Sequence, residues 1–287
     1  MSRRKLVTIG SVNLDLIGYC EKLPQPGETV TGATFAQFPG GKGANQTLAA
    51  RRLGADVTML ARVGHDANAE AALELLRRDG VDLSRLVVDE TAPTGVALIG
   101  VEQSGENSII VASGANANLS ANDIEGAGPA DAVLCQLEVP MDAIKAASRI
   151  ETPLFAMNLA PSRPVPEAIL ARADLLIVNE VEAAFYGDAL EAGGGMVAKT
   201  LGRDGAVLYR DGAEVARMPV FEVPVIDTVG AGDTFCAALA LALAEGMADM
   251  AALRFASAAA ALAVTKNGAQ PSLPWREEVD AFLKDKA

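Results

Sequence analysis

Histidine is almost missing from this chain, and its scarcity excludes whole classes of chemistry. Among 287 residues only His65 is a histidine, so a metal centre built on several imidazoles cannot form. A Ser-His-Asp triad would have to use His65, which lies in VGHDANAE, where Asp66 resembles a helix N-cap. We therefore interpret His65 as a loop residue without a chemical role.

Cysteines and aromatic residues are also scarce. The three cysteines, Cys20, Cys135 and Cys236, lie far apart. An odd count without paired spacing argues against a disulfide framework and fits a reducing compartment. Aromatics make up 4% of the chain, whereas half of it is hydrophobic. The core must therefore consist mainly of Ala, Val, Leu and Ile, which favours helices packed on a buried sheet.

The chain lacks both an excess of positive charge and long hydrophobic runs. Its formal net charge is −13 and its pI about 4.6, so nucleic acid and anionic membranes are not expected partners. The longest apolar runs, FCAALALALA and ASAAAALAV, are far shorter than the ~20 residues of a membrane span. The N-terminus shows no signal-peptide cleavage pattern. We therefore predict a cytoplasmic protein.

What the sequence has in quantity is an alternation of short strand-like and helix-like runs. Strands are expected at 5–12, 56–64, 131–139, 153–159 and 174–179, and helices at 66–80, 141–150 and 166–173. This rhythm predicts an α/β fold, with a mostly parallel central sheet and helices on both faces. Hairpin-like stretches, approximately within 14–40 and 94–112, do not fit it. They predict a small β-sheet lid, the second hairpin turning at QSGE, within a single domain of residues 1–287.

Polar residues are expected at the ends of several strands. In an open α/β sheet, ligands bind at the carboxyl ends of the strands. Six polar stretches are expected at such ends, namely SVNLD, QLEVP, MNLAPS, IVNEVE, KTLGRDG and DTVGAGD. Together they predict a polar crevice at one edge of the sheet.

The stretch DTVGAGDTF, residues 227–235, is the strongest local signal of an anion site. The chain has no G-x-x-x-x-G-K-[ST] motif, and Phe235 stands where a dinucleotide fingerprint needs a small residue. A glycine turn that leads into a helix directs backbone amides at an anion. Asp233 could simply cap this helix. A carboxylate beside an anion is costly as a passive feature, however, so we predict that it is a general base.

Two motifs resemble signatures of the ribokinase-like, or PfkB, family of carbohydrate kinases. They are GGKGAN at 40–45 and DTVGAGD at 227–233, in the expected order, with SVNLD ahead of both and TLGRDG between them. The resemblance covers nearly the whole chain. It implies a three-layer α/β sandwich with a small β-sheet lid, and ATP-dependent phosphorylation of D-ribose at O5.

The resemblance also implies a role for each matching residue. Asp233 would be the general base, beside an anion hole at Gly230, Ala231 and Gly232. The sugar would be held, together with Asp233, by Asn13, Asp15, Gly41, Lys42, Asn45 and Glu138. ATP would be held by Asn179, Thr200, Gly202, Gly205, Gly232 and Ser257. Potassium would be bound by Asp227, Val229, Ala263, Lys266, Gly268 and Ser272, and Glu182 would act on Mg²⁺ through water.

Two further expectations follow from the resemblance. The lid strands would pair between two chains, giving a homodimer. Segment 188–199 is shorter than in the family, and Gly193–Gly195 favour neither helix nor strand, which could loosen the ATP side. The alternatives are a related kinase for 2-deoxyribose, a ketose or a nucleoside, and a non-catalytic sugar sensor with a decayed ATP site.

Overall fold

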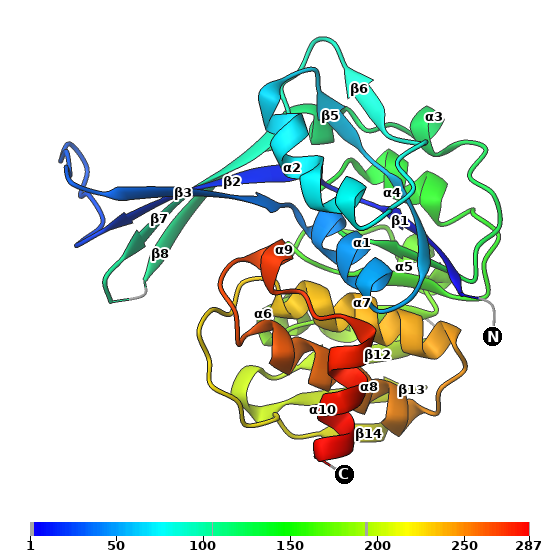
Figure 1. Ribbon diagram of the computed structural model, residues 1–287. Coiled ribbons are helices and arrows are strands. Elements are labelled where there is room, and N and C mark those ends of the chain that lie inside the picture. Colours follow the sequence, from blue (N-terminus) through cyan, green and yellow to red (C-terminus); the bar gives the residue numbers. More distant parts are fainter. Residues whose placement is uncertain (1–2, 105, 193–194, 287) are drawn as a thin grey trace.

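The computed structural model describes residues 3–104, 106–192 and 195–286 (Figure 1). Its central sheet has strands β1 (Lys5–Ile9), β4 (Asp56–Leu60), β9 (Ala132–Cys135), β10 (Phe155–Asn158), β11 (Leu175–Val178), β12 (Met196–Thr200), β13 (Ala206–Arg210) and β14 (Ala213–Met218). Their order is β14-β13-β12-β11-β10-β9-β1-β4. All pairs from β12 to β4 are parallel, and the pairs β12–β13 and β13–β14 are antiparallel. The predicted mostly parallel sheet is confirmed.

Helices cover both faces of this sheet because alternate residues of each buried strand point to opposite sides. Leu6 and Leu134 pack into one hydrophobic core, and their neighbours Val7 and Val133 into another. The first core contains α1 (Lys42–Arg52), α2 (Ala67–Arg78), α7 (Ala231–Ala244), α8 (Asp249–Ala263) and α10 (Arg276–Asp285). The second contains α3 (Ala121–Ile124), α4 (Met141–Ala147), α5 (Glu167–Arg172) and α6 (Glu180–Tyr186). The predicted three-layer arrangement is confirmed.

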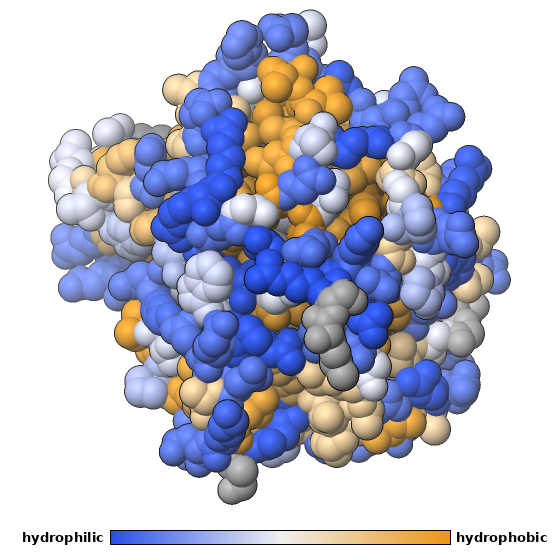
Figure 2. All heavy atoms as spheres, turned by 45° about the vertical axis from the view of Figure 1, so that its right-hand side comes forward, coloured by the Kyte–Doolittle hydropathy of each residue, from blue (hydrophilic) through white to orange (hydrophobic). Residues whose placement is uncertain are grey.

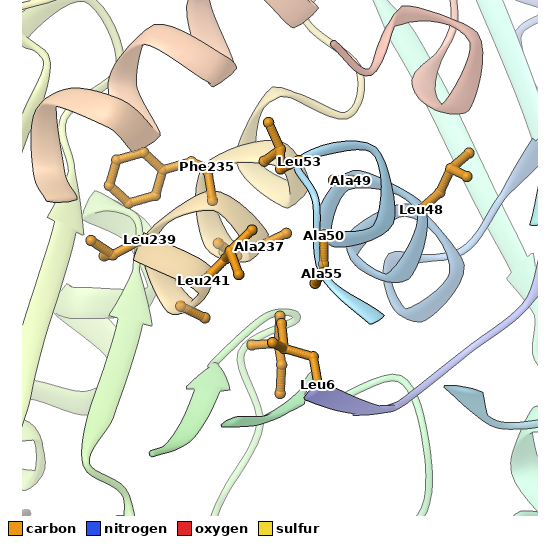
Figure 3. Packing of buried hydrophobic residues seen from close by; sticks show 14 of the residues in the cluster. Leu6, Leu48, Ala49, Ala50, Leu53, Ala55, Phe235, Ala237, Leu239 and Leu241 are labelled. Atoms are coloured by element: carbon orange, nitrogen blue, oxygen red, sulfur yellow. The ribbon is translucent and has the colours of Figure 1, made fainter. Parts of the chain in front are cut away.

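Alanine allows α1 and α7 to pack closely against each other. Ala49 and Ala50 of α1 and Ala237 of α7 are fully buried, and Figure 3 shows these helices side by side above Leu6 of β1. Small side chains at a helix contact allow the two backbones to approach. The first turns of α1 and α7 therefore meet at one edge of the sheet.

A second sheet projects from the main body (Figure 1). It contains β2 (Asn13–Cys20), β3 (Thr34–Gly40), β7 (Gly95–Glu102) and β8 (Asn107–Ala112) in the order β3-β2-β7-β8. We call these four strands the lid. Gly105, expected in the turn between β7 and β8, lies outside the described residues.

The prediction of one strand over residues 56–64 was wrong. The structure divides it into β4 and β5 (Arg62–Gly64), and β5 pairs with β6 (Val87–Asp89) in a separate two-stranded sheet. The division occurs at Ala61, whose carbonyl accepts a hydrogen bond from the Val87 amide over 3.0 Å. The chain therefore leaves the central sheet one residue after Leu60.

Segment 188–199, which the resemblance led us to expect to be shorter than in the family, leads into a regular strand. β12 pairs with β11 over four residues and with β13 over five. Gly195 precedes β12, and a Cβ there would lie 2.5 Å from the Asp174 carbonyl oxygen, so the close approach of two chain segments requires glycine. Gly193 and Gly194 lie outside the described residues.

Most residues on the face drawn in Figure 2 are hydrophilic, apart from a few hydrophobic patches.

His65 is exposed, and its Nδ1 lies 3.2 Å from Glu90 Oε2. Among the helices of the described residues, none is long and apolar enough to cross a membrane.

Candidate active site

Five of the six polar stretches follow neighbouring parallel strands, β1, β9, β10, β11 and β12. The sixth, residues 227–233, does not end a strand, contrary to the prediction. The amides of Ile226 and Asp227 donate to the Val264 carbonyl, over 2.8 and 3.2 Å, in place of strand pairing. This stretch reaches the site because it leads into α7, whose first turn lies beside that of α1.

Asp233 lies in the first turn of α7 and is only 8% exposed. Its carboxylate does not cap the helix, since no side chain caps α7. The side chain instead turns toward α1, where Asn45 Nδ2 donates to Oδ2 and Gln46 Nε2 donates to Oδ1, each over 2.9 Å. A passive cap therefore does not explain Asp233.

The backbone before Asp233 forms a sharp turn. Gly230 precedes α7 with φ of 82°, a left-handed conformation that favours glycine. The Ala231 amide, expected to face an anion, donates to the Thr228 carbonyl over 3.3 Å. A Cβ on Gly232 would meet nothing within 4 Å. There is thus open space beside Gly232, in a helix turn whose amides have no partner within the helix.

Acidic groups and one lysine surround Asp233. Burial, with Glu138 and Asp233 nearby, raises the pKa of Asp15 to about 7. Asp233, and to a smaller extent Glu138, raise the pKa of Lys42 against the opposing effect of burial. Lys42 is therefore held as a cation among carboxylates at the start of α1.

Close backbone contacts explain the glycines of the GGKGAN motif. A Cβ on Gly40 would lie 2.3 Å from Asp15 Oδ2, and a Cβ on Gly43 would lie 2.5 Å from the backbone nitrogen of Ser11. A side chain at Gly40 would separate β3 from Asp15 of β2, and one at Gly43 would separate α1 from the backbone that follows β1. The motif therefore lets the polar residues of α1 meet those that follow β1.

The remaining residues predicted to hold a sugar converge here. Glu138 Oε2 accepts from Ser11 Oγ and from the Lys42 amide, the latter over 3.1 Å. Asn13 Oδ1 accepts from Asn116 Nδ2 over 2.8 Å. A pocket of about 270 Å³ lies beside them, and its lining includes Ser11, Asn13, Asn116, Glu138 and Arg163.

Sequence reasoning missed Ser11, Asn116, Gln46, Gln136 and Asn158 as members of the site. Asn116 fixes Val12 through two hydrogen bonds, of 2.9 and 3.0 Å. Gln46 directly follows the GGKGAN motif, and Gln136 opens QLEVP, so their positions next to motifs were the available signal. Nothing in the local sequence pointed to Asn116.

A second pocket, of about 260 Å³, has Gly232 in its lining and is mostly apolar. Val225, Phe235 and Val264 form part of its wall. Five of the six residues predicted to bind ATP line it, namely Thr200, Gly202, Gly205, Gly232 and Ser257. The buried Ser257 hydroxyl has no hydrogen-bond partner among the described residues.

Asn179, the sixth predicted ATP residue, does not line this pocket. It caps α6, because its side chain accepts from the Glu182 amide while Glu182 Oε2 accepts from the Asn179 amide, each over 2.8 Å. Glu182 is 7% exposed, and burial raises its pKa although nearby Lys42 opposes the rise. This pair is thus a capping box that also brings a buried carboxyl group toward Lys42.

The residues predicted to bind potassium come from two adjacent segments, the loop 227–229 and the stretch 263–272 from the end of α8 to α9. Asp227 Oδ1 accepts from the Val229 amide over 3.0 Å, and Oδ2 accepts from the Gly268 amide over 2.9 Å. Ser272 is buried in α9 (Ala269–Ser272). The Lys266 ammonium pairs with Glu278 over 2.9 Å. The atom of Lys266 that could bind a cation is therefore its backbone carbonyl oxygen. Within the described ranges, no three His, Cys, Asp or Glu side chains form a metal cluster.

Residues 3–276 match the pfkB family of carbohydrate kinases. The chain belongs to this family. A ribokinase of Bacillus subtilis (strain 168) is 39% identical over 294 residues, which cover 98% of this chain and 99% of the relative. This PfkB chain is thus a carbohydrate kinase.

Solved structures agree with this assignment of fold. The ribokinase of Thermotoga maritima has a TM-score of 0.89 and 33% identity, and the match covers 98% of this chain and 99% of that one. The Arabidopsis thaliana ribokinase complexed with ribose and ATP has a TM-score of 0.87 and 31% identity, with 99% of each chain covered. The ribokinase-like fold expected from the sequence is confirmed.

Proposed function

We propose that this PfkB kinase transfers the γ-phosphoryl group of ATP to O5 of D-ribose, giving D-ribose 5-phosphate and ADP. One observation carries the proposal: Asp233 directly follows Gly232, which lines the apolar pocket, while its carboxylate contacts the polar residues of α1. The relatives named ribokinase, one of them complexed with ribose and ATP, support this substrate pair.

In the proposed reaction Asp233 accepts the proton of the O5 hydroxyl. The oxygen attacks the γ-phosphorus, a new O–P bond forms, and the bond from that phosphorus to the β,γ-bridging oxygen breaks with its electrons leaving on ADP. Amides of the first turn of α7, with Gly230 shaping the turn, stabilise charge on the transferring group. The Ala231 amide contributes once it leaves its long contact with Thr228.

The sugar side matches the chemistry of a polyol. Asn13, Asp15, Asn45 and Glu138 supply side-chain donors and acceptors, Lys42 supplies donors, and Gly41 lets the backbone approach. Their partial burial favours a sugar whose hydroxyls replace water, since polar groups buried without partners are costly.

The nucleotide side matches an adenine base. Adenine has apolar ring faces, and Val225, Phe235 and Val264 offer apolar surface. The unpartnered Ser257 hydroxyl can bond to a ring nitrogen or to the exocyclic amine. Thr200, Gly202 and Gly205 lie at the end of β12, and Gly232 brings the pocket up to Asp233. Asn179 would support the nucleotide site only indirectly, by capping the N-terminus of α6.

Membership of a family of ATP-dependent kinases implies that a divalent cation such as Mg²⁺ takes part in the reaction. The carboxylate of Glu182 fits Mg²⁺, which binds proteins through few carboxylates and keeps its waters. We propose that Glu182 acts on this ion through water. Mg²⁺ supplies charge neutralisation at the phosphates when bound.

Potassium fits the two segments around Asp227 because the atoms that could coordinate it are all oxygens. These are the Asp227 carboxylate, the Ser272 hydroxyl and the carbonyls of Val229, Ala263, Lys266 and Gly268. We expect potassium to raise the rate more than sodium does, and Asp227→Ala to abolish that difference. Equal rates in both salts for the unmodified enzyme would remove the potassium assignment.

A homodimer through the lid is the proposed quaternary structure. Phe35 is 68% exposed and Ile110 65% exposed, and Ile109 and Val111 are exposed as well, so the lid presents apolar side chains that pairing with a second lid would cover. Ile110→Ser should shift the mass measured by light scattering toward a monomer. Val215→Ser, on β14, is the matched control for an exposed apolar residue. A wild-type monomer would contradict the proposal.

The function is tested by ADP release with ATP, Mg²⁺ and potassium in the presence of D-ribose, 2-deoxyribose, fructose or adenosine. We expect the highest kcat/KM with D-ribose, and a product that co-elutes with D-ribose 5-phosphate. Higher kcat/KM with another acceptor would reassign the substrate within the family. Binding of ribose without ADP formation would favour the sugar sensor, which the regular pairing of β12 speaks against.

A further inference from the structure

Both oxygens of Asp233 are held by amide groups from adjacent positions of α1. Asn45 holds Oδ2 and Gln46 holds Oδ1. Two hydrogen bonds to different oxygens fix the plane of a carboxylate, while its remaining lone pairs can still accept a proton. Gln46 is fully buried. It was absent from the site expected from the sequence.

The surroundings of Gln46 determine which way its amide points. Its Nε2 faces two acceptors, Asp233 Oδ1 at 2.9 Å and Asn158 Oδ1 at 3.1 Å. Its Oε1 faces a donor, Gln136 Nε2, at 2.6 Å. A reversed amide would set oxygen against two oxygens and NH₂ against NH₂. The donor from Gln136 therefore helps to keep the Gln46 NH₂ group directed at Asp233.

Gln136 lies directly after β9 and is fully buried. Within the described residues, its side chain donates to Gln46 and makes no hydrogen bond to Asp233. A Cβ on Gly10 would lie only 2.0 Å from the Oε1 atom of Gln136. Only glycine at position 10 leaves room for this side chain beside β1. The chain Gly10–Gln136–Gln46–Asp233 thus joins the ends of β1 and β9 to the base on α7.

We propose that Gln136 is a positioning residue for the phosphoryl transfer, acting through Gln46 on the orientation of Asp233. The proposal rests on the proposed function, in which Asp233 is the base. Gln136 acts on no substrate, so its loss should change the chemical step and leave binding nearly unchanged. A small misorientation of a catalytic group can lower a rate by orders of magnitude.

The test compares Gln136→Met, which keeps the length of the side chain and removes the donor, in two backgrounds. In the wild-type background kcat should fall about tenfold, while KM for D-ribose and for ATP stays within about twofold. In the Asp233→Asn background the same change should lower the residual kcat by less than about twofold, because the base it orients is gone. Gln46→Met should lower kcat at least as much as Gln136→Met.

Thr8→Val is the matched control, because it also removes a buried hydrogen bond between β1 and α1. Thr8 Oγ1 lies 2.5 Å from Thr47 Oγ1, and Thr47 donates to the Gly43 carbonyl. Among the described residues, neither threonine side chain is hydrogen-bonded to Asp233 or Gln46. Thr8→Val should lower the melting temperature and keep kcat within about twofold.

The outcomes separate the two proposals. An inactive Asp233→Asn variant with an unchanged kcat in Gln136→Met overturns the role of Gln136 alone. Equal losses from Gln136→Met in both backgrounds, or a loss of kcat in Thr8→Val as large as in Gln136→Met, reduce Gln136 to a structural role and also overturn it. If Asp233→Asn keeps the wild-type rate, the base assignment fails and this proposal fails with it.

Discussion

The two sides of Asp233 are built in different ways. On the polar side, side chains from α1 and from the ends of β9 and β10 are hydrogen-bonded around the carboxylate. Residues of β2 and of the ends of β1 and β9 form further hydrogen bonds in the same site. On the other side, the wall is mostly apolar, with backbone at glycines and one unpartnered hydroxyl. The side chains of the polar side are in place without a ligand, although Asn45 Oδ1 and Gln136 Oε1 have no hydrogen-bond partner among the described residues. The apolar side contributes mainly the shape of its wall. Substitutions should therefore have large effects on the first side and small effects on the second.

The largest effect is expected at the centre of the polar side. Asp233→Asn keeps the size and polarity of the side chain and removes the base, so kcat should fall at least ~100-fold while the protein stays folded. Steady-state kinetics with D-ribose and a circular dichroism spectrum measure the two quantities. Asp249→Asn is the matched control, since Asp249 also lies in the first turn of a helix, α8, and pairs with Arg210 away from the site. A wild-type rate in Asp233→Asn would remove the base from the mechanism.

The next effect is expected at Lys42, the cation among the carboxylates. Lys42→Met retains the apolar stem and removes the charge that faces Asp233 and Glu138. Loss of a charged interaction in a partly buried site costs about 1.5–3 kcal/mol, so kcat/KM for D-ribose should fall roughly 10- to 100-fold. Lys145→Met, at an exposed position of α4, is the control. Equal kcat/KM in the two variants would show that Lys42 is an ordinary surface lysine.

The polar side should also make stability depend on pH. The pKa of Asp15 is about 7 in the folded protein, above its ordinary value of 3.8. The folded state therefore binds more protons than the unfolded state between these pH values, and stability falls as pH rises through this window, by on the order of 4 kcal/mol in total. Asp15→Asn removes this loss.

The melting temperature measures that difference. Asp15→Asn should melt close to the wild type at pH 4, increasingly above it as pH rises to 7, and several degrees above it at pH 8. Glu138 and Asp233 are present in both proteins, so the difference between the two curves reports on Asp15. An unchanged difference between pH 4 and pH 8 would contradict a raised pKa for Asp15. Binding of D-ribose to Asp15→Asn should be weaker, since an acceptor is lost.

The sequence could predict those features of the fold and the site that depend on local patterns. The alternation of strands and helices gave the layers, because alternate residues such as Leu6 and Val7 pack into opposite cores. The motifs located Lys42, Asn45 and Asp233 because each stands beside glycines whose spacing has a physical reason. Periodicity could not find the point where residues 56–64 divide, since Ala61 leaves the sheet through a contact with Val87.

Long-range contacts set the limit for the site itself. Gln46, Gln136 and Asn158 meet across about a hundred residues of sequence, and a buried glutamine has no local pattern that reveals its partners. Residues 227–233 were expected to follow a strand, but the Val264 carbonyl, at the end of α8, accepts hydrogen bonds from the amides of Ile226 and Asp227. Asn179 and Glu182 were read as ligands, and their capping box becomes visible only once the start of α6 is known.

The smallest effect is expected at Ser257, on the apolar side. Its hydroxyl is buried without a partner among the described residues, so Ser257→Ala removes a desolvation penalty in the free protein as well as one hydrogen bond in the complex. These two changes oppose each other, and a neutral hydrogen bond contributes about 1 kcal/mol net. KM for ATP should therefore rise less than about threefold, with kcat unchanged and a melting temperature equal to or above that of the wild type. If KM for ATP rose tenfold or more, Ser257 would be recognising the base as strictly as the polar side recognises the sugar, and the contrast between the two sides would not hold.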